Sequence, residues 1–488
     1  MKAAEPFGAP AWARAAACSA LLPRLREGGV KQLRLAWADL HGTLRGKTLV
    51  GNVDAMGQTL ASGIGLVSTM LLKDTSDRTA FKVFEPGAMA ALEGFGQANN
   101  LLLLPDPASF TLLPWAQGTA WLRCEPWWAD GTAVAVDPRR VLQRALAELG
   151  AAGHGLVCGL EVEFHIYRIA DERLAVEDAA WPAEPPALKL IHPVYALLAE
   201  SSADLAEEPL AIVRRTALDL GLPLRSLEIE LGPSQVEAVF APVDALTAAD
   251  QMILLRNHVR QALRRAGYHA SFVCRPPLPH AVASGWHLHQ SLTDLDGRNV
   301  MPCTAVGAGK LDARRTLSDA GTHWLAGLLA HAQGMAALCA PTIPAYSRFQ
   351  GSVMAPQAAV WGRDNRGAML RVLGEVGAAD TRIENRIAEP MANPYLAIAA
   401  QVWAGLDGLQ RGLEPGPATE SPYAPGPAPL PPTLAAALDA LAQDEVMQRG
   451  LGPAMAEVFA TVKRQEIARH AQAEDKAQWE RREYFGRY

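Results

Sequence analysis

The chain has 488 residues, of which 49% are hydrophobic and 20% charged, values typical of a globular protein large enough for two or more domains. Its net charge is −6 and no stretch forms a basic stripe, which argues against nucleic acid as a partner. The six cysteines are scattered without a Cys-x-x-Cys pair, a pattern that provides no zinc framework and is typical of a reducing compartment.

The sequence predicts neither a targeting segment nor a membrane span. Residues 1–30 predict an Ala-rich helix or a loose arm, without the continuous apolar stretch of a signal peptide. The longest apolar stretch, residues 324–345, is interrupted by His331, Gln333 and prolines, which argues against a membrane span. We therefore expect a cytoplasmic protein that does not contact a membrane.

The pattern of elements predicts two domains after the N-terminal arm. Residues 31–132 are rich in short strand patterns and predict a small sheet domain, and residues 133–488 predict a larger domain in which strands and helices alternate. Residues 415–432 contain eight prolines and predict a loop or spacer. The helices expected in the larger domain are 141–150, opened by Asp137-Pro138, then 248–266, 319–339, 434–441 and 455–471.

Four short segments alternate acidic, histidine or arginine residues with apolar ones. They are Leu160–Tyr167, Leu227–Phe240, Ser284–Leu292 and Thr381–Ile387. Successive side chains of a strand point to opposite faces, so each segment predicts a strand with one charged and one apolar face. The charged faces carry Glu161, Glu163, His165 and Tyr167, then His287 and His289, and then Arg382, Glu384 and Arg386.

A strand face rich in carboxylates predicts a bound cation. Burying an unpaired charge is very costly, and divalent metal ions are the obvious counter-charge for several carboxylates. Arginines beside such a face are suited to holding an anionic ligand. The pattern therefore indicates phosphate chemistry that depends on a nucleotide and a metal.

A motif that looks like a phosphate-binding loop, Gly42–Thr48, does not fit that assignment. The loop requires four residues between its glycines, and here there are three. It also precedes a strand-like run, so no helix N-terminus would receive the phosphate. We interpret Arg45 and Lys47 as residues of a solvated turn, although either could touch a ligand.

From Asp39 to the C-terminus the chain resembles the glutamine synthetase superfamily, and more closely its branch of gamma-glutamylpolyamine (gamma-glutamylamine) synthetases. Eight motifs in order and with sensible spacing support the resemblance, whereas any one of them would be weak. They are DLHGTLRGK (39–47), GLEVEF (159–164), ELGPSQVE (230–237), SGWHLHQSL (284–292), SRF (347–349), WGRDNRGAMLR (361–371), RIENR (382–386) and NPYLAIAA (393–400).

The resemblance implies an α+β fold with an N-terminal beta-grasp domain. It also implies a glutamine-synthetase-type catalytic domain, in which antiparallel strands form an open half-barrel with flanking helices. It further implies a homo-oligomeric ring, typically a dodecamer of two stacked hexamers, with each active site shared between neighbouring subunits. ATP and Mg²⁺ or Mn²⁺ are the implied cofactors.

The resemblance also assigns site residues. Glu163, Glu230 and Glu237 match the ligands of one divalent ion, and Glu161, His287 and Glu384 match the ligands of a second. His289 and Ser291 match positions near the nucleotide, and Arg348 matches the arginine that binds the substrate α-carboxylate. Arg366, Arg371 and Arg386 match arginines that contact the phosphates and the developing acyl phosphate. His165 is left as a supporting or structural residue, Glu228 as a solvated charge, and Arg382 as either a nucleotide contact or a structural ion pair.

Two departures from the family pattern concern the substrates. The glutamate that covers the ammonium site in glutamine synthetases is replaced by Met354, and the small-domain aspartate has no match in residues 63–70. Methionine cannot attract or deprotonate ammonium, so we expect an organic amine with an alkyl body as the acceptor. Val282-Ala283 also replaces an Asn-Gly pair that contacts the amino-acid end of glutamate, which leaves the acid less certain than the nucleotide.

These observations predict an ATP-dependent ligase that joins the γ-carboxylate of glutamate to an amine through γ-glutamyl phosphate. Polyamines and monoamines both stay open as acceptors, and the general base is not identified. An ammonia-using glutamine synthetase is one alternative, and a non-catalytic regulatory or structural member of the superfamily is another. A two-carboxylate sugar hydrolase would explain Glu161 and Glu163 without explaining the histidines and arginines, so it is discarded.

Overall fold

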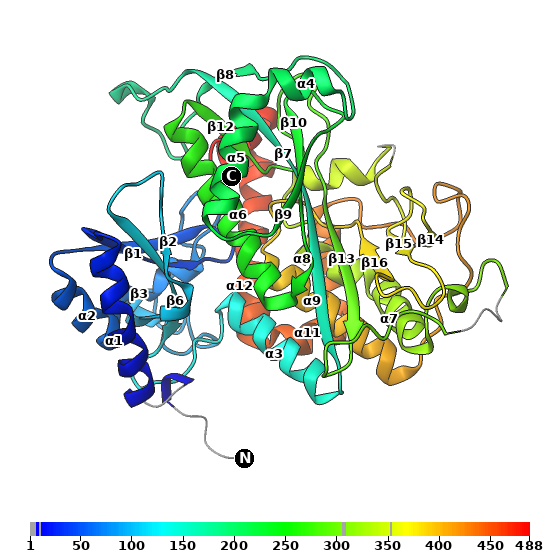
Figure 1. Cartoon of the computed structure of the whole chain (residues 1–488), viewed down its shortest axis with the longest axis horizontal. Coiled ribbons are helices and arrows are strands. Elements are labelled where there is room, and N and C mark those ends of the chain that lie inside the picture. The colour runs from blue at the N-terminus through cyan, green and yellow to red at the C-terminus, as the bar shows by residue number, and fades with distance from the viewer. Residues whose placement is uncertain (1–5, 9–10, 305–308, 352–353) are drawn as a thin grey trace.

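The structure is a computed structural model that describes residues 6–8, 11–304, 309–351 and 354–488. Figure 1 shows two sheet-containing regions side by side: a smaller one drawn in blue and cyan, and a larger one that runs from cyan to red. Among the residues described, no helix is both long and apolar enough to cross a membrane.

The N-terminal region contains a mixed sheet with strand order β2-β1-β6-β4-β3 and a short strand β5 beside β6. Strands β1 and β6 run parallel, and the other pairs are antiparallel. The strands are β1 Gln32–Ala38, β2 Leu44–Val50, β3 Ile64–Val67, β4 Asn100–Pro105, β5 Thr111–Leu112 and β6 Thr119–Trp127. The helices are α1 Ala11–Glu27, α2 Val53–Ser62 and the 3-10 turns η1 Pro6–Gly8, η2 Ser68–Leu72, η3 Gly96–Ala98 and η4 Pro107–Ser109.

The larger region is built on a ten-stranded curled sheet whose main order is β14-β15-β16-β13-β7-β10-β9. The long strand β7, Gly155–Asp171, is its centre and also pairs with β8, β11 and β12. All pairs are antiparallel except β14 with β15, so the α+β half-barrel architecture that we expected is confirmed with one parallel pair. The other strands are β8 Ala187–Leu190, β9 Leu224–Ile229, β10 Gln235–Phe240, β11 Val243–Asp244, β12 Tyr268–Ser271, β13 Trp286–Thr293, β14 Trp361–Arg363, β15 Leu370–Leu373 and β16 Arg382–Asn385.

Helices cover one face of this sheet and form the C-terminal part of the chain. The longer ones are α3 Pro138–Ala151, α5 Glu207–Asp219, α6 Ala245–Arg265, α7 Asp319–Ala330, α8 Ala332–Cys339, α9 Pro394–Arg411, α10 Leu434–Gln443 and α12 Pro453–Gln472. The shorter ones are α4 Glu200–Leu205, α11 Glu445–Leu451, α13 Lys476–Glu480, the 3-10 helices η5 Val176–Asp178, η6 Ala313–Arg315 and η7 Pro344–Phe349, and the π-helix η8 Arg481–Phe485.

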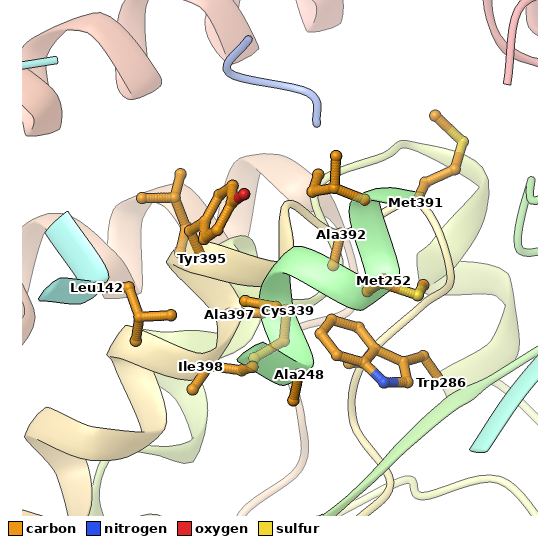
Figure 2. Close-up of a cluster of buried hydrophobic side chains, with 14 of the residues drawn as sticks. Leu142, Ala248, Met252, Trp286, Cys339, Met391, Ala392, Tyr395, Ala397 and Ile398 are labelled. Atoms are coloured by element: carbon orange, nitrogen blue, oxygen red, sulfur yellow. The ribbon is translucent and has the colours of Figure 1, made fainter. Parts of the chain in front are cut away.

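The apolar face of the central sheet packs against helices, as the alternating pattern predicted. On β7, Leu160, Val162, Phe164 and Ile166 are all buried. Figure 2 shows how Trp286 of β13 meets residues of helices α6, α8 and α9 in this core. Because burial of apolar area drives folding, this packing fixes which face of the sheet points away from the core, and that face carries the acidic residues.

Two segments differ from the expectations. The predicted helix 319–339 is divided at His331, whose backbone leaves helical geometry while its ring bonds Asp407 and Asp444. The proline-rich segment 415–432 has no helix or ladder strand, as predicted, but it is not a free spacer. It lies along residues 357–365, as the Ala359 N to Ala428 O bond of 2.9 Å shows.

The small sheet is joined to the large region through buried polar contacts. On α6, Arg256 donates to the carbonyl of His41 at 2.9 Å, and Asn257 donates to that of Gly42 at 3.0 Å. Gly42 has a φ of +71°, and a Cβ there would lie 1.9 Å from an Arg256 nitrogen, so only glycine fits this approach. Residues 44–50 form strand β2 and not a helix, which agrees with the prediction that Gly42–Thr48 is not a phosphate-binding loop. Arg45 is not in a solvated turn, because it pairs with Asp39 at 2.6 Å.

Candidate active site

Four neighbouring strands bring the acidic and histidine residues onto one face. Across β7 and β13 the register places Glu161 opposite His287, and across β7 and β10 it places Glu163 opposite Glu237. Across β13 and β16 it places His289 opposite Glu384. Side chains directly opposite one another on adjacent strands share a face and lie within reach of each other. Segments far apart in sequence therefore meet at one place.

The ligand atoms of these residues form two overlapping groups. One group is Glu161, His287 and Glu384, and the other is Glu163, Glu237 and His287, with the atoms of each group within 4.8 Å of one another. The first group is the set predicted for the second ion. The second group contains His287 and not Glu230, which was expected there; the Glu230 Oε2 atom accepts a hydrogen bond from the Leu231 N–H at 2.9 Å.

The carboxylates repel one another where no cation separates them. Burial, together with the neighbouring carboxylates, raises the pKa of Glu163 and Glu237. Burial alone would also raise the pKa of Glu161, but hydrogen bonds from His287 and His289 lower it instead. Carboxylate oxygens with one imidazole suit Mg²⁺ or Mn²⁺, so the donor set fits the expected metal.

A hydrogen-bond network holds the Glu163 carboxylate and fixes which of its two oxygens faces the other ligand atoms. Its Oε2 atom accepts from the Gly285 N–H at 2.9 Å and from the Gln235 amide at 3.2 Å. Gln235 also donates to the Ser284 hydroxyl at 3.0 Å, and Ser284 lies 3.4 Å from the ring of His165. The other oxygen, Oε1, lies 3.6 Å from His287 and remains available for a cation. His165 therefore lies behind the carboxylates, as a supporting residue would.

Two of the predicted arginines meet at Glu384, which is fully buried. Arg371 donates to its Oε2 atom at 3.0 Å, and Arg386 pairs closely with its Oε1 atom. Arg371 also pairs with Asp364. Burial would raise the pKa of Glu384, but His287 and Arg386 lower it, so this carboxylate stays charged.

The other two arginines are placed differently. Arg348 is only 4% exposed, and its guanidinium donates to the carbonyls of residues 386–388, the closest being Arg386 O at 2.9 Å. It lies beside Gly285, which also adjoins the Nε2 atom of His287. Arg366 is exposed on the loop between β14 and β15, and among the described residues no ion pair joins it to the carboxylates.

A cavity of about 980 Å³ opens beside the carboxylates. Its lining includes Glu161 together with His289 and Ser291, the two residues predicted near the nucleotide. The His289 ring bonds Glu161 at 3.1 Å, and both residues line the cavity, so the cavity reaches the carboxylate group directly. Arg382 also lines the cavity, and its Nε donates to His289 at 3.2 Å. The cavity is large enough for a nucleotide-sized molecule.

Met354 lies next to this site at the flap position. Its side chain is 43% exposed, and its carbonyl accepts from the Arg386 guanidinium at 3.1 Å. Its backbone has a φ of +63°, a left-handed conformation that is uncommon for methionine. No carboxylate therefore occupies the flap position itself.

Sequence reasoning missed several neighbours of the site. Gln235 and Asp364 lie inside matched motifs but carried no charge pattern that would single them out. Glu228, which we expected to be a solvated charge, lies opposite Glu237 in the register of β9 and β10. Tyr423 lies in the proline-rich segment, and its hydroxyl accepts from the Met354 N–H at 2.8 Å. Strand alternation could have indicated Glu228, whereas Tyr423 had no local signal.

Known proteins resemble this chain in sequence and in fold. Residues 135–484 match the family model described as the glutamine synthetase catalytic domain. Gamma-glutamylanilide synthase of Acinetobacter sp is 34% identical over 96% of this chain and 95% of its own length. Gamma-glutamylethanolamide synthetase GlnA4 of Streptomyces coelicolor is 30% identical over 94% of both chains. A solved structure described as a GmaS/ADP complex is 27% identical, with a TM-score of 0.74, over 95% of this chain and 98% of that one.

The predicted resemblance is thus confirmed by the family model, by relatives over nearly the whole chain, and by the fold. The chain belongs to the glutamine synthetase family.

Proposed function

We propose that this protein is an ATP-dependent ligase that joins the γ-carboxylate of glutamate to an organic amine. The observation that carries the proposal is the site itself: a carboxylate–histidine group and two arginines lie beside a nucleotide-sized cavity, and a methionine occupies the flap. Relatives whose names describe γ-glutamylamide-forming enzymes support the same class of reaction.

The first step transfers the terminal phosphoryl group of ATP to the γ-carboxylate of glutamate, which yields γ-glutamyl phosphate and ADP. When bound, the divalent ions would neutralise phosphate charge. Glu161, His287 and Glu384 would hold one ion, and Glu163, Glu237 and Glu230 the other. Glu230 would reach its ion by turning away from the Leu231 N–H.

The arginines bind and orient the anionic groups. Arg348 would bind the α-carboxylate of glutamate after exchanging its backbone carbonyl partners for that group. Arg386 and Arg371 already converge on Glu384, so their guanidinium groups would stabilise the charge that develops on the acyl phosphate. Arg366 would approach the phosphates from its exposed loop, and His289 with Ser291 would contact the nucleotide in the cavity.

In the second step the amine nitrogen attacks the acyl carbon. A carbon–nitrogen bond forms, the bond from carbon to the phosphate oxygen breaks, and phosphate leaves while the amine loses a proton. Met354 offers an apolar, flexible wall for the body of the amine, and cannot attract ammonium as a glutamate would. Both polyamines and monoamines stay within this proposal. Ammonia is the alternative acceptor.

The organisation of the protein is proposed with the activity. We keep residues 1–30 as an arm, 31–132 as the beta-grasp domain and 133–488 as the catalytic domain. We also propose a homo-oligomeric ring, a dodecamer, in which the small domain of one subunit completes the site of its neighbour. The six free, buried cysteines suit the reducing cytoplasm as the proposed location.

The test is phosphate release from ATP with Mg²⁺ and glutamate, comparing ammonium with single amines that include aniline, ethanolamine, isopropylamine and putrescine. The proposal expects release with at least one organic amine, together with the matching γ-glutamylamide by mass spectrometry. Release with ammonium alone would establish a divergent glutamine synthetase. Absence of turnover with every acceptor, together with absence of metal-dependent ATP binding, would favour a non-catalytic member of the family.

A further inference from the structure

We propose that Tyr423, in the proline-rich segment 415–432, is a positioning residue for the active-site flap. Its hydroxyl holds the backbone of Met354, and through Met354 it holds the guanidinium of Arg386. The role in the reaction rests on the proposed function, whereas the contact itself can be tested without activity.

The first contact is made at the backbone of Met354. Its N–H donates to the Tyr423 hydroxyl at 2.8 Å, while its carbonyl accepts from Arg386 at 3.1 Å. The left-handed φ of +63° costs free energy for a residue with a side chain, so it persists only where neighbours enforce it. The two hydrogen bonds, one on each side of the residue, supply that constraint.

The second contact is made with the loop that carries Arg366. A Cβ on Gly367, the next residue, would lie 3.0 Å from the Tyr423 hydroxyl oxygen and 2.6 Å from a ring carbon of Pro422. The loop and the proline-rich segment are therefore packed without space for a methyl group. Tyr423 touches both of the loops that flank the site.

The proline-rich segment is itself held in place, so Tyr423 can hold the backbone of Met354 at a fixed position. Its backbone bonds residues 357–361 at three points: Thr419 N to Trp361 O at 2.9 Å, Ala359 N to Ala428 O at 2.9 Å, and Leu430 N to Gln357 O at 3.0 Å. These bonds lie on both sides of Tyr423 in the sequence. A tyrosine on a loose spacer could not constrain the flap in this way.

Arg386 connects this contact to the chemistry. One of its guanidinium nitrogens pairs with Glu384, and the other donates to the Met354 carbonyl. Loss of the Tyr423 hydroxyl would leave the Met354 N–H without this partner, and the Met354 carbonyl would then hold the Arg386 guanidinium less firmly. Arg386 is proposed to stabilise the acyl phosphate, and neither Arg386 nor Tyr423 lines the nucleotide cavity. The effect should therefore fall on turnover with the amine rather than on ATP binding.

The experiment compares Tyr423→Phe, which removes only the hydroxyl, with Tyr195→Phe as the matched control. Tyr195 is also exposed, and its hydroxyl also bonds one backbone group, the His280 carbonyl at 3.0 Å. We expect Tyr423→Phe to lower kcat/KM for the amine roughly two- to tenfold, the loss of one hydrogen bond. The KM for ATP and the melting temperature should stay unchanged. Hydrogen exchange at the Met354 amide should become faster, and Gly367→Ala, which displaces Tyr423, should act in the same direction.

Unchanged exchange at Met354 in Tyr423→Phe would overturn the proposal, as would unchanged amine kinetics in an active enzyme. A parallel fall in thermal stability and ATP affinity would also overturn it, since that result describes a general structural role. If the wild-type protein is inactive with every amine, the proposed function fails, and the exchange measurement alone then decides whether Tyr423 holds the flap.

Discussion

Gly285 provides the most direct test of how the site holds its acid substrate. A Cβ at this position would lie 2.6 Å from an Arg348 guanidinium nitrogen and 2.8 Å from His287 Nε2. Contacts this short cannot persist, so Gly285→Ala must displace one of these groups. Arg348 is buried among the carbonyls of residues 386–388, which leaves little space for a small adjustment.

The magnitude follows from these contacts. Inserting a methyl group into a packed site costs about 1–3 kcal/mol, so the variant should fold with reduced stability. A hydrogen bond to a charged group contributes about 1.5–3 kcal/mol. If the methyl group moves Arg348 out of register with the α-carboxylate, the KM for glutamate should rise roughly 10- to 150-fold. The KM for ATP should change far less, because Arg348 and Gly285 lie outside the lining of the cavity.

The assay is ADP release at saturating amine, with the glutamate and ATP concentrations varied in turn. Gly150→Ala on helix α3 is the matched control, because a Cβ there meets nothing within 4 Å. Circular dichroism establishes that both variants are folded. A folded Gly285→Ala protein with a glutamate KM within twofold of wild type would refute the reasoning, and so would an equal rise in both KM values.

Three further predictions follow from the same structure. Met354→Glu restores a carboxylate at the flap position, whose backbone carbonyl bonds Arg386, and should raise ammonium-dependent turnover at least roughly tenfold, measured as glutamine by mass spectrometry. Organic amines should be used less well, and the absence of any ammonium turnover would contradict the role of the flap. Mg²⁺ or Mn²⁺ at about a hundred times its dissociation constant should stabilise the wild-type protein by about 3 kcal/mol in thermal unfolding. Glu384→Gln or Glu237→Gln should reduce this stabilisation, because each removes a ligand oxygen. Equal stabilisation of the variants would place the metal elsewhere. Burial lowers the pKa of His331, but its bonds to Asp444 at 2.8 Å and Asp407 at 3.0 Å outweigh burial and raise it. Protonated His331 should therefore add to the free energy of unfolding. This contribution should be complete below pH 6.5 and lost as the pH rises through the folded pKa. His331→Gln should abolish this dependence, and a wild-type stability advantage that does not shrink between about pH 6 and pH 9 would contradict it.

Local patterns in the sequence predicted much of the architecture. The alternation along Leu160–Tyr167 correctly assigned β7 its acidic and its apolar face, because side-chain direction in a strand depends only on position parity. Asp137 and Pro138 correctly marked the start of α3, where the Asp137 side chain caps the helix by accepting from the Arg139 N–H. The order and spacing of the motifs predicted the family, which the family model confirms.

Other features depended on contacts between distant segments. The break between α7 and α8 follows from the pairing of His331 with Asp407 and Asp444, residues that lie 76 and 113 positions away. The apolar pattern of 319–339 continues through that point, so periodicity alone predicts one helix. The composition of the proline-rich segment likewise predicts a spacer, because prolines exclude regular structure without indicating which surface the segment will contact.

The sequence by itself determined which residues carry the charges and which face of each strand they occupy, because both follow from side-chain identity and the two-residue repeat of a strand. Only the tertiary structure decided that Glu161 lies opposite His287, that His287 belongs to both ligand groups, and that the Tyr423 hydroxyl bonds the Met354 N–H. Register between strands and contacts between loops are set by packing across the whole fold, and no local pattern specifies them.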